Sequence, residues 1–347
     1  MCLRLRIAYL HFACTLAAVG MVGCWLPRSV YAETPLAPSA SPVDGASFSA
    51  KDTLNIGRED KPDARQCLDA LAWEPTTFNV TLQAAHERAG DMLVRFPSPR
   101  PLGDPVNDLA AMEWYQARDA NGKLQFAPAA VVVHESGSGM TVGRLIAKSL
   151  RSKGIHTFML QLPYYGARRE GQRPQGARLM ESLLQSVADT RRARDAVASL
   201  PGVDSDRISL QGTSLGGFVA ATTAGLDRGY HSIFILLAGG DLASVLSDGK
   251  KDAQKVREAV LAGMDEAEYK NMLHRIEPLR LAHRIDAART WLYSGSFDTV
   301  VPPRNSALFA TAAQLAEDHH LKMLANHYSG IIFLPMISQQ MSQHMRE

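Results

Sequence analysis

Three side chains in the second half of the chain have the types and the order that nucleophilic catalysis requires. Ser214 lies in the stretch Gly-Thr-Ser-Leu-Gly, between an apolar run and an alanine-rich one. A serine hydroxyl attacks a carbonyl carbon only when a base takes its proton, and that base needs an acid to fix its tautomer. We predict that Asp298 is the acid and His327 the base, because each follows an apolar run and they come after the serine in that order.

Other residues could fill two of these roles. Asp241 also ends an apolar run ahead of the histidine, so it remains a rival to Asp298. We favour Asp298 because its apolar run is the penultimate one, although an aspartate in either place is also a common helix N-cap. His319, His320 and His344 also follow Asp298. They fall at the start of the last apolar run or in the polar C-terminal end, where we expect surface positions.

The glycines on either side of Ser214 suit a sharp turn between a strand and a helix. Neighbours without side chains let the serine backbone adopt a strained conformation close to both elements. Such a turn would hold the Ser214 hydroxyl clear of the sheet, at the N-terminus of the following helix. We therefore predict that the amide of Leu215 meets the charge developing on a substrate carbonyl oxygen.

A second stretch of small residues, HESGSG at residues 134–139, follows another apolar run. A loop in this place supplies the second donor of an oxyanion hole. We expect that donor to be the amide of Glu135 or of Ser136, and the residues leave the choice open. His134 is expected to brace the loop rather than to titrate in the reaction.

The elements that must position these residues can be recognised from their periodicity. Strand-like runs at 77–83, 91–98, 109–117 and 127–135 come first, and from residue 139 helical and strand-like segments alternate to the C-terminus. Continuous apolar strands separated by helices predict an α/β fold with a mostly parallel sheet covered on both faces, and the early strands predict an antiparallel edge. The charged segment at about 241–286 breaks the alternation and is predicted to form a helical cap.

These motifs together resemble those of the α/β-hydrolase superfamily, from about residue 75 to the C-terminus. The matching stretches are HESGSG, GTSLGG at 212–217, SGSFDTVVPP at 294–303 and NHYSGIIFLP at 326–335. With LPYYGARR at 162–169, the chain is also similar to exported bacterial hydrolases near the dienelactone-hydrolase and acetyl-esterase branches. The resemblance implies hydrolysis of a small-molecule ester through a covalent acyl-enzyme, with no metal and no organic cofactor.

Two other functions stay open. The same three residues cleave amides in peptidases of this fold, although no obvious pair of acids that would bind an amine stands out in the sequence. The fold also occurs in non-catalytic binding proteins, against which the complete set of serine, acid and histidine argues. Tyr164 and Tyr165 are candidates for binding the substrate, and Arg168 and Arg169 could bind a substrate carboxylate or sugar hydroxyls.

The N-terminus has the composition of an export signal. Residues 1–32 combine early arginines, an apolar stretch and a small residue at Ala32, which predicts a signal peptide and a secreted or periplasmic protein. A retained membrane anchor, or a lipoprotein acylated on Cys24, is the alternative. Residues 33–62 are rich in proline, serine and alanine and predict a flexible linker, which leaves 63–347 as the hydrolase domain.

Charge and cysteine content exclude some classes of partner and of stabilisation. Without the predicted leader, 34 basic and 35 acidic residues remain, so nothing favours a nucleic-acid partner. Cys67 would then be the one cysteine left, and a single thiol closes no disulfide within the chain. Its helical surroundings predict a packed rather than a reactive thiol.

Overall fold

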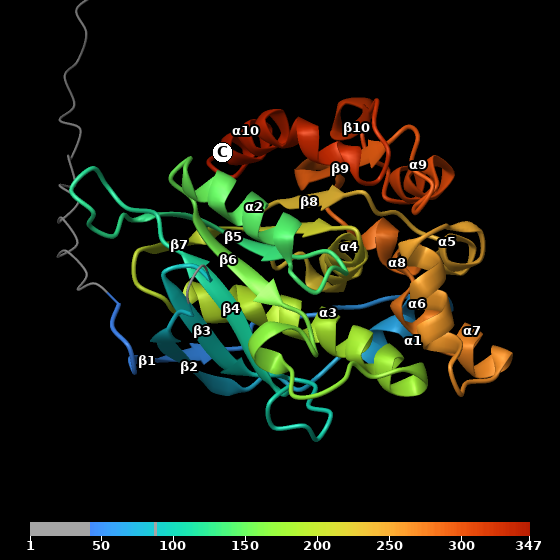
Figure 1. Cartoon of the computed structure of the whole chain (residues 1–347), viewed down its shortest axis with the longest axis horizontal. Helices are drawn as coiled ribbons and strands as arrows, with labels where there is room; N and C mark the ends of the chain where they lie inside the picture. The colour runs from blue at the N-terminus through green and yellow to red at the C-terminus, as the bar shows by residue number, and fades with distance from the viewer. Residues whose placement is uncertain (1–41, 87–88) are drawn as a thin grey trace, which may run out of the picture. The chain divides into compact units, whose positions relative to one another are not determined.

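A ten-stranded sheet organises the residues that the computed structural model describes, which are 42–86 and 89–347 (Figure 1). The strand order is β1-β2-β3-β4-β6-β5-β7-β8-β9-β10. The predicted signal peptide, Cys24 and the first residues of the predicted linker lie outside the described residues. No helix within the described residues is long and apolar enough to cross a membrane.

The sheet has an antiparallel part and a parallel part, as predicted. The antiparallel strands are β1 (Ser47–Lys51), β2 (Thr77–Ala84), β3 (Met92–Pro97) and β4 (Leu109–Tyr115). The parallel strands are β5 (Ala127–Val133), β6 (His156–Gln161), β7 (Val203–Thr213), β8 (Ile233–Leu236), β9 (Thr290–Gly295) and β10 (His320–Met323). Strand β4 joins the two parts by pairing antiparallel with β6. Every residue of β5 and β6 is buried, which requires cover on both faces of the sheet.

In the described part of the chain, six α-helices outside the predicted cap accompany the sheet. They are α1 (Pro62–Leu71), α2 (Thr141–Arg151), α3 (Gly176–Ala198), α4 (Leu215–Asp227), α9 (Pro303–Ala312) and α10 (Leu334–His344). Helix α2 contacts β6 and α10, whereas α3 contacts α4. Cys67 is buried in α1 and its thiol donates to the carbonyl oxygen of His274, so the predicted packed position of this cysteine is confirmed.

Short helices fill the segment predicted to be a cap. They are α5 (Leu242–Asp248), α6 (Asp252–Leu261), α7 (Glu266–Ile276) and α8 (Pro278–Leu281). Single 3₁₀ turns occur at Gly166–Arg168, Ala282–Arg284, Ala287–Arg289, Glu317–His319 and Ser329–Phe333. Helix α6 also contacts α3, so the cap lies against the longest helix of the described chain.

The prediction of a flexible linker over residues 33–62 is wrong from residue 47 onward. Residues 47–51 form β1, and Asp52 after it is only 3 % exposed. Arg192 of α3 donates to both carboxylate oxygens of Asp52, and Thr53 donates to Asp195 of the same helix. The composition of the segment conceals this order, because its charged partners lie 140 residues further along the chain.

Candidate active site

Ser214 occupies the turn between β7 and α4 with a backbone that serine rarely adopts. Its φ is 54° and its ψ is −116°, and its amide donates to the carbonyl oxygen of Leu236 at 2.9 Å. A positive φ in a residue with a Cβ atom costs about 1–3 kcal/mol and persists only where the surroundings enforce it. The turn therefore holds the Ser214 side chain in one place, as a sharp strand-to-helix turn around a nucleophile does.

The glycines next to Ser214 allow this close packing. A Cβ atom on Gly212 would lie 2.1 Å from the carbonyl oxygen of Gly216, and a Cβ atom on Gly216 would lie 2.2 Å from that of Val133. A Cβ atom on Gly217 would lie 2.6 Å from the Cβ of Ala238. Two of these three contacts are with backbone atoms, which have no rotamer with which to move away. Each glycine is therefore required where the elbow meets β5, β8 and its own helix.

Gly216→Ala tests the tightness of this turn. The added methyl group collides with the backbone of β5, so we expect a loss of roughly 2–4 kcal/mol in the free energy of unfolding. Chemical denaturation of the purified variant measures it. Gly330→Ala is the matched control, because its Cβ atom would lie 3.4 Å from the nearest side-chain atom, at ordinary contact distance. Equal stability of the two variants would contradict the steric account of the elbow.

The three predicted residues meet in one chain of hydrogen bonds. The Oγ of Ser214 lies 2.9 Å from Nε2 of His327, and Nδ1 of His327 lies 2.7 Å from Oδ2 of Asp298. The other carboxylate oxygen of Asp298 accepts the amides of Val300 and Val301 at 2.8 and 2.9 Å. Asp298 follows β9 and His327 follows β10, so adjacent parallel strands deliver both side chains to the same edge of the sheet.

The rival candidates lie in other arrangements. Asp241 is the N-cap of α5, where its side chain accepts the amide of Ser244. His319 bonds two backbone carbonyl oxygens, His320 bonds a serine hydroxyl of β9, and His344 stacks on a tryptophan ring. None of these three histidines has a hydrogen bond to Ser214 among the described residues.

His134 is held as a neutral brace. Its Nε2 accepts the amide of Leu162 at 3.1 Å and its Nδ1 donates to the carbonyl oxygen of Glu135 at 2.5 Å. Burial lowers the pKa of His134 to about 3, because a charged imidazolium would lose its hydration there. The ring is therefore uncharged at neutral pH and ties the loop after β5 to the loop after β6.

The two candidate oxyanion donors differ in what surrounds them. The carboxylate of Glu135 accepts the amides of Val142 and Gly143 at 3.1 Å, and thus caps the start of α2. Its side chain has a structural task, which accounts for a glutamate in a stretch of small residues. Glu135, Ser136 and Leu215 all line the cavity that contains Ser214. Leu215 is the first residue of α4, so its amide has no acceptor within the helix.

Tyr164 and Tyr165 line the same cavity but use their hydroxyls inside the protein. The hydroxyl of Tyr165 donates to the carbonyl oxygen of Ser136 at 2.8 Å, and its ring packs on that of His134. The hydroxyl of Tyr164 accepts from Nε of Arg178 at 3.0 Å. What the two tyrosines offer to a ligand is therefore mainly the faces and edges of their rings.

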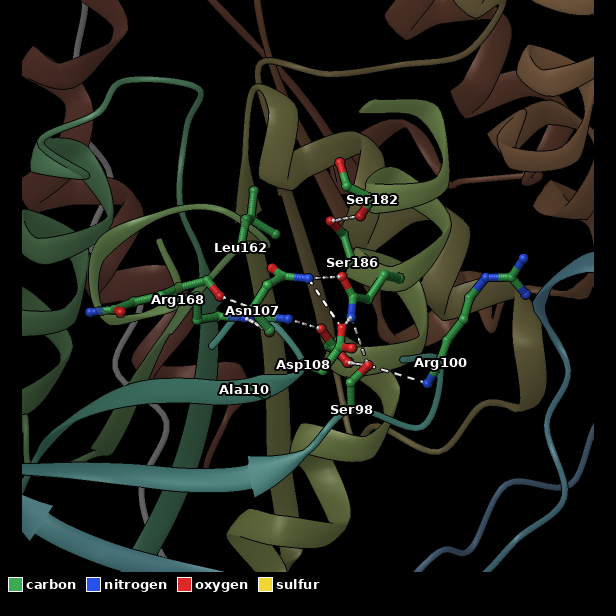
Figure 2. Close-up of polar contacts among 12 residues, drawn as sticks. Ser98, Arg100, Asn107, Asp108, Ala110, Leu162, Arg168, Ser182 and Ser186 are labelled. Atoms are coloured by element: carbon green, nitrogen blue, oxygen red, sulfur yellow. Dashed lines mark hydrogen bonds and ion pairs between the residues drawn. The ribbon is translucent and has the colours of Figure 1, made fainter. Parts of the chain in front are cut away.

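Arg168 does not reach the cavity, which corrects its candidacy as a substrate-binding residue. Its guanidinium is fully buried and donates to the carboxylate of Asp189 at 2.7 Å and to the carbonyl oxygens of Asn107 and Gln161 (Figure 2). The side chain of Asn107 in turn accepts the amide of Tyr164 at 3.0 Å. No pattern in the sequence distinguishes the buried Arg168 from the exposed Arg169 beside it.

Two cavities adjoin Ser214. The larger holds about 800 Å³ and opens between the loop after β5, α3, α6 and the loop after β10. The smaller holds about 90 Å³ and lies between α4 and the cap, where most of its lining is apolar. Ser136, Ser214 and Leu215 line both cavities, so a group bonded to Ser214 has access to each.

Sequence reasoning missed a contact between helix α6 of the cap and the loop after β10, which carries His327. The hydroxyl of Tyr328 donates to the carboxylate of Asp252 at 3.0 Å, and Nζ of Lys251 lies 4.8 Å from the centre of the Tyr328 ring. Burial and the Asp252 carboxylate raise the pKa of Tyr328 to about 12. In the sequence, the helical pattern of α6 and the position of Tyr328 next to His327 were the signals available. Neither indicates that Tyr328 bonds Asp252.

Comparisons with known proteins agree with the fold. Residues 176–331 match the prolyl oligopeptidase family. No curated protein matches the chain. Among solved structures, an acetyl xylan esterase from Paenibacillus sp. R4 is similar with a TM-score of 0.57 and 16 % identity, over 84 % of this chain and 96 % of that one.

Two further solved structures give the same result. Acetyl xylan esterase 1 from Thermoanaerobacterium sp. JW/SL YS485 has a TM-score of 0.54 and 17 % identity, over 81 % of this chain and 92 % of that one. A puromycin-hydrolyzing peptidase from Mycobacterium tuberculosis has a TM-score of 0.52 and 17 % identity, over 77 % of this chain and 45 % of that one. Together with the sheet order, these likenesses show that the described chain has the α/β-hydrolase fold.

Proposed function

We propose that this protein hydrolyses carboxylic esters through an acyl-enzyme formed on Ser214. The observation that carries the proposal is the unbroken series of hydrogen bonds from the Ser214 hydroxyl through His327 to Asp298. A neutral His327 with its proton on Nδ1 presents an acceptor nitrogen to the hydroxyl, which is the arrangement that a general base needs.

The geometry supports a two-step reaction. His327 takes the proton of Ser214 as Oγ attacks the substrate carbonyl, and Asp298 stabilises the resulting imidazolium. The amides of Leu215 and of Ser136 or Glu135 donate to the oxyanion. His327 then gives its proton to the departing alcohol, the acyl group stays on Ser214, and a water that His327 deprotonates releases the acid.

An ester is the better supported substrate, and a peptide is the alternative. Two of the solved structures described above are acetyl xylan esterases, whereas the prolyl oligopeptidase match and the puromycin-hydrolyzing peptidase favour amide cleavage. A fluorophosphonate probe followed by p-nitrophenyl esters and aminoacyl p-nitroanilides separates the functions. We expect labelling and ester turnover. Labelling with turnover of amides alone would favour the peptidase, and a folded protein without labelling would favour a binding role.

The small inner cavity predicts a preference for short acyl groups. A dry cavity of about 150 Å³ holds benzene, so about 90 Å³ suits a chain of roughly three or four carbons. Over the p-nitrophenyl esters, we expect kcat/KM to be highest between acetyl and butyryl and to fall for hexanoyl and longer chains. The measurement is a chain-length series with the purified protein.

Variants of the lining residues test whether the acyl group occupies the inner cavity. Leu246 lines the inner cavity and not the larger one, so Leu246→Ala should move the optimum to longer chains. Leu145 lines only the larger cavity, and Leu145→Ala is the matched control that should leave the optimum in place. A shift caused by the control, and not by Leu246→Ala, would place the acyl group in the larger cavity instead.

A further inference from the structure

The mouth of the larger cavity carries cations on two sides. The segment 166–178, between β6 and the first turn of α3, has exposed arginines at 169, 173 and 178 and one acid, Glu170. On the cap, the start of α6 contributes Lys251 and Lys255. Of these residues, Arg173 and Lys255 line the cavity that contains Ser214.

Arg173 lies over the ring of Tyr165 at this mouth without a carboxylate partner. Its guanidinium carbon lies 3.9 Å from the centre of the Tyr165 ring, and Nη1 lies 3.5 Å from the carbonyl oxygen of Ser136. Within the described residues no aspartate or glutamate pairs with it, whereas Arg168 and Arg144 each hold a carboxylate. Stacking on an aromatic face leaves the edge of a guanidinium free to bind an anion through two parallel hydrogen bonds.

The acids of the cavity do not neutralise this cation. The carboxylate of Glu135 caps α2 by accepting the amides of Val142 and Gly143. That of Asp252 accepts the Tyr328 hydroxyl and lies 3.5 Å from Nζ of Lys255. Both acids are thus engaged elsewhere, and neither forms an ion pair with Arg173.

The position of Arg173 relative to the scissile bond decides which part of a substrate it would bind. Its stacking partner, Tyr165, donates to Ser136, which lines both cavities next to Ser214. Arg173 itself lines only the larger cavity. If the acyl group occupies the inner cavity, as proposed above, the alcohol part of the ester extends towards Arg173.

We propose that Arg173 binds a carboxylate on the alcohol part of the substrate, so that the preferred substrates are short-chain acyl esters of hydroxy acids. This inference rests on the proposed esterase function. A charge-assisted bidentate hydrogen bond at a partly open site corresponds to about a tenfold to hundredfold gain in kcat/KM.

A matched pair of substrates tests the inference. In 4-acetoxybenzoate the leaving phenol carries a carboxylate, and in its methyl ester that charge is removed while the acetyl group stays the same. We expect Arg173→Ala to lower kcat/KM for 4-acetoxybenzoate by about tenfold to hundredfold and to change that for the methyl ester by less than threefold. Arg173→Lys should keep part of the preference, because it retains the charge but not the fork.

Arg169→Ala is the matched control, since Arg169 is exposed in the same segment and does not line the cavity. It should leave both substrates unchanged. Equal losses on both substrates with Arg173→Ala would overturn anion recognition and assign Arg173 to the support of Tyr165. No change on either substrate, or the same change with Arg169→Ala, would overturn it as well.

A binding measurement keeps the test independent of turnover. Calorimetric titration of 4-acetoxybenzoate into Ser214→Ala protein, compared with the Ser214→Ala/Arg173→Ala protein, should show about tenfold weaker binding or more in the double variant. Binding that is equal in the two proteins would overturn the inference. Failure of the esterase proposal has a different signature, which is the absence of turnover of either ester by the unmodified protein, with or without fluorophosphonate labelling.

Discussion

Ser214→Ala is expected to lower kcat for ester hydrolysis by roughly 10³- to 10⁶-fold while the protein stays folded. The hydroxyl oxygen is the atom that would bond to the acyl group, and it lies within hydrogen-bond distance of His327 Nε2. Alanine fits the turn without new contacts, because it removes one oxygen. Steady-state kinetics with p-nitrophenyl acetate, with thermal melting as the test of folding, measure the effect.

Variants of Asp298 and of its rival Asp241 provide a further test of this assignment. Asp298→Asn should lower kcat by about 10³- to 10⁴-fold, because an amide in this place favours the wrong tautomer of His327. Asp241→Asn is the matched variant, since Asp241 caps α5 and has no bond to the histidine. We expect it to keep kcat within about threefold. Large activity losses in both aspartate variants, or retained activity in Ser214→Ala, would contradict the assignment.

Arg168→Ala is expected to lower the free energy of unfolding by about 3–5 kcal/mol. The Arg168 and Asp189 side chains are both 0 % exposed, so the variant leaves a buried carboxylate without its cation. Burial already raises the pKa of Asp189, with the Arg168 charge acting in the opposite direction. Urea or guanidinium denaturation, followed by circular dichroism, gives the change in free energy.

Two comparisons make this prediction specific. Arg169→Ala removes the same charge one residue later at an exposed position, and should change stability by less than about 0.5 kcal/mol. The double variant Arg168→Met/Asp189→Leu removes both charges and should recover part of the loss. A double variant that is less stable than Arg168→Ala would show that the network acts through its other hydrogen bonds and not through the unpaired charge.

The sequence indicates that three candidate residues lie close together, because each of them follows a strand of one parallel sheet. Ser214, Asp298 and His327 come after β7, β9 and β10, and parallel strands present their carboxyl ends at one edge, so chain order alone indicates that the three lie together. The glycines carry a further signal, since the turn excludes a Cβ atom on either side of the serine.

The remaining features depend on partners that are distant in the chain. Strand β1 was predicted to be a linker, because its order depends on pairing with β2 and on the ion pair between Arg192 of α3 and Asp52, which no local pattern reveals. The same holds for Arg168 and Arg173, which have similar sequence surroundings. Arg168 is buried against Asp189, whereas Arg173 stacks on Tyr165 at the cavity. Only the tertiary structure distinguishes these two positions.

The strand order has a consequence for how the protein folds. Strand β4 pairs with β6 and not with β5, its neighbour in the chain, so during synthesis its edge stays open until residue 161 has emerged. The N-terminal strands also wait for α3, which carries the partners of Asp52 and Thr53. A fragment that ends before residue 127 would retain an unpaired strand edge and an unpaired acid, and such edges favour aggregation. We therefore expect that two fragments divided near residue 120 do not fold independently, although residues 120–123 lie in an exposed turn.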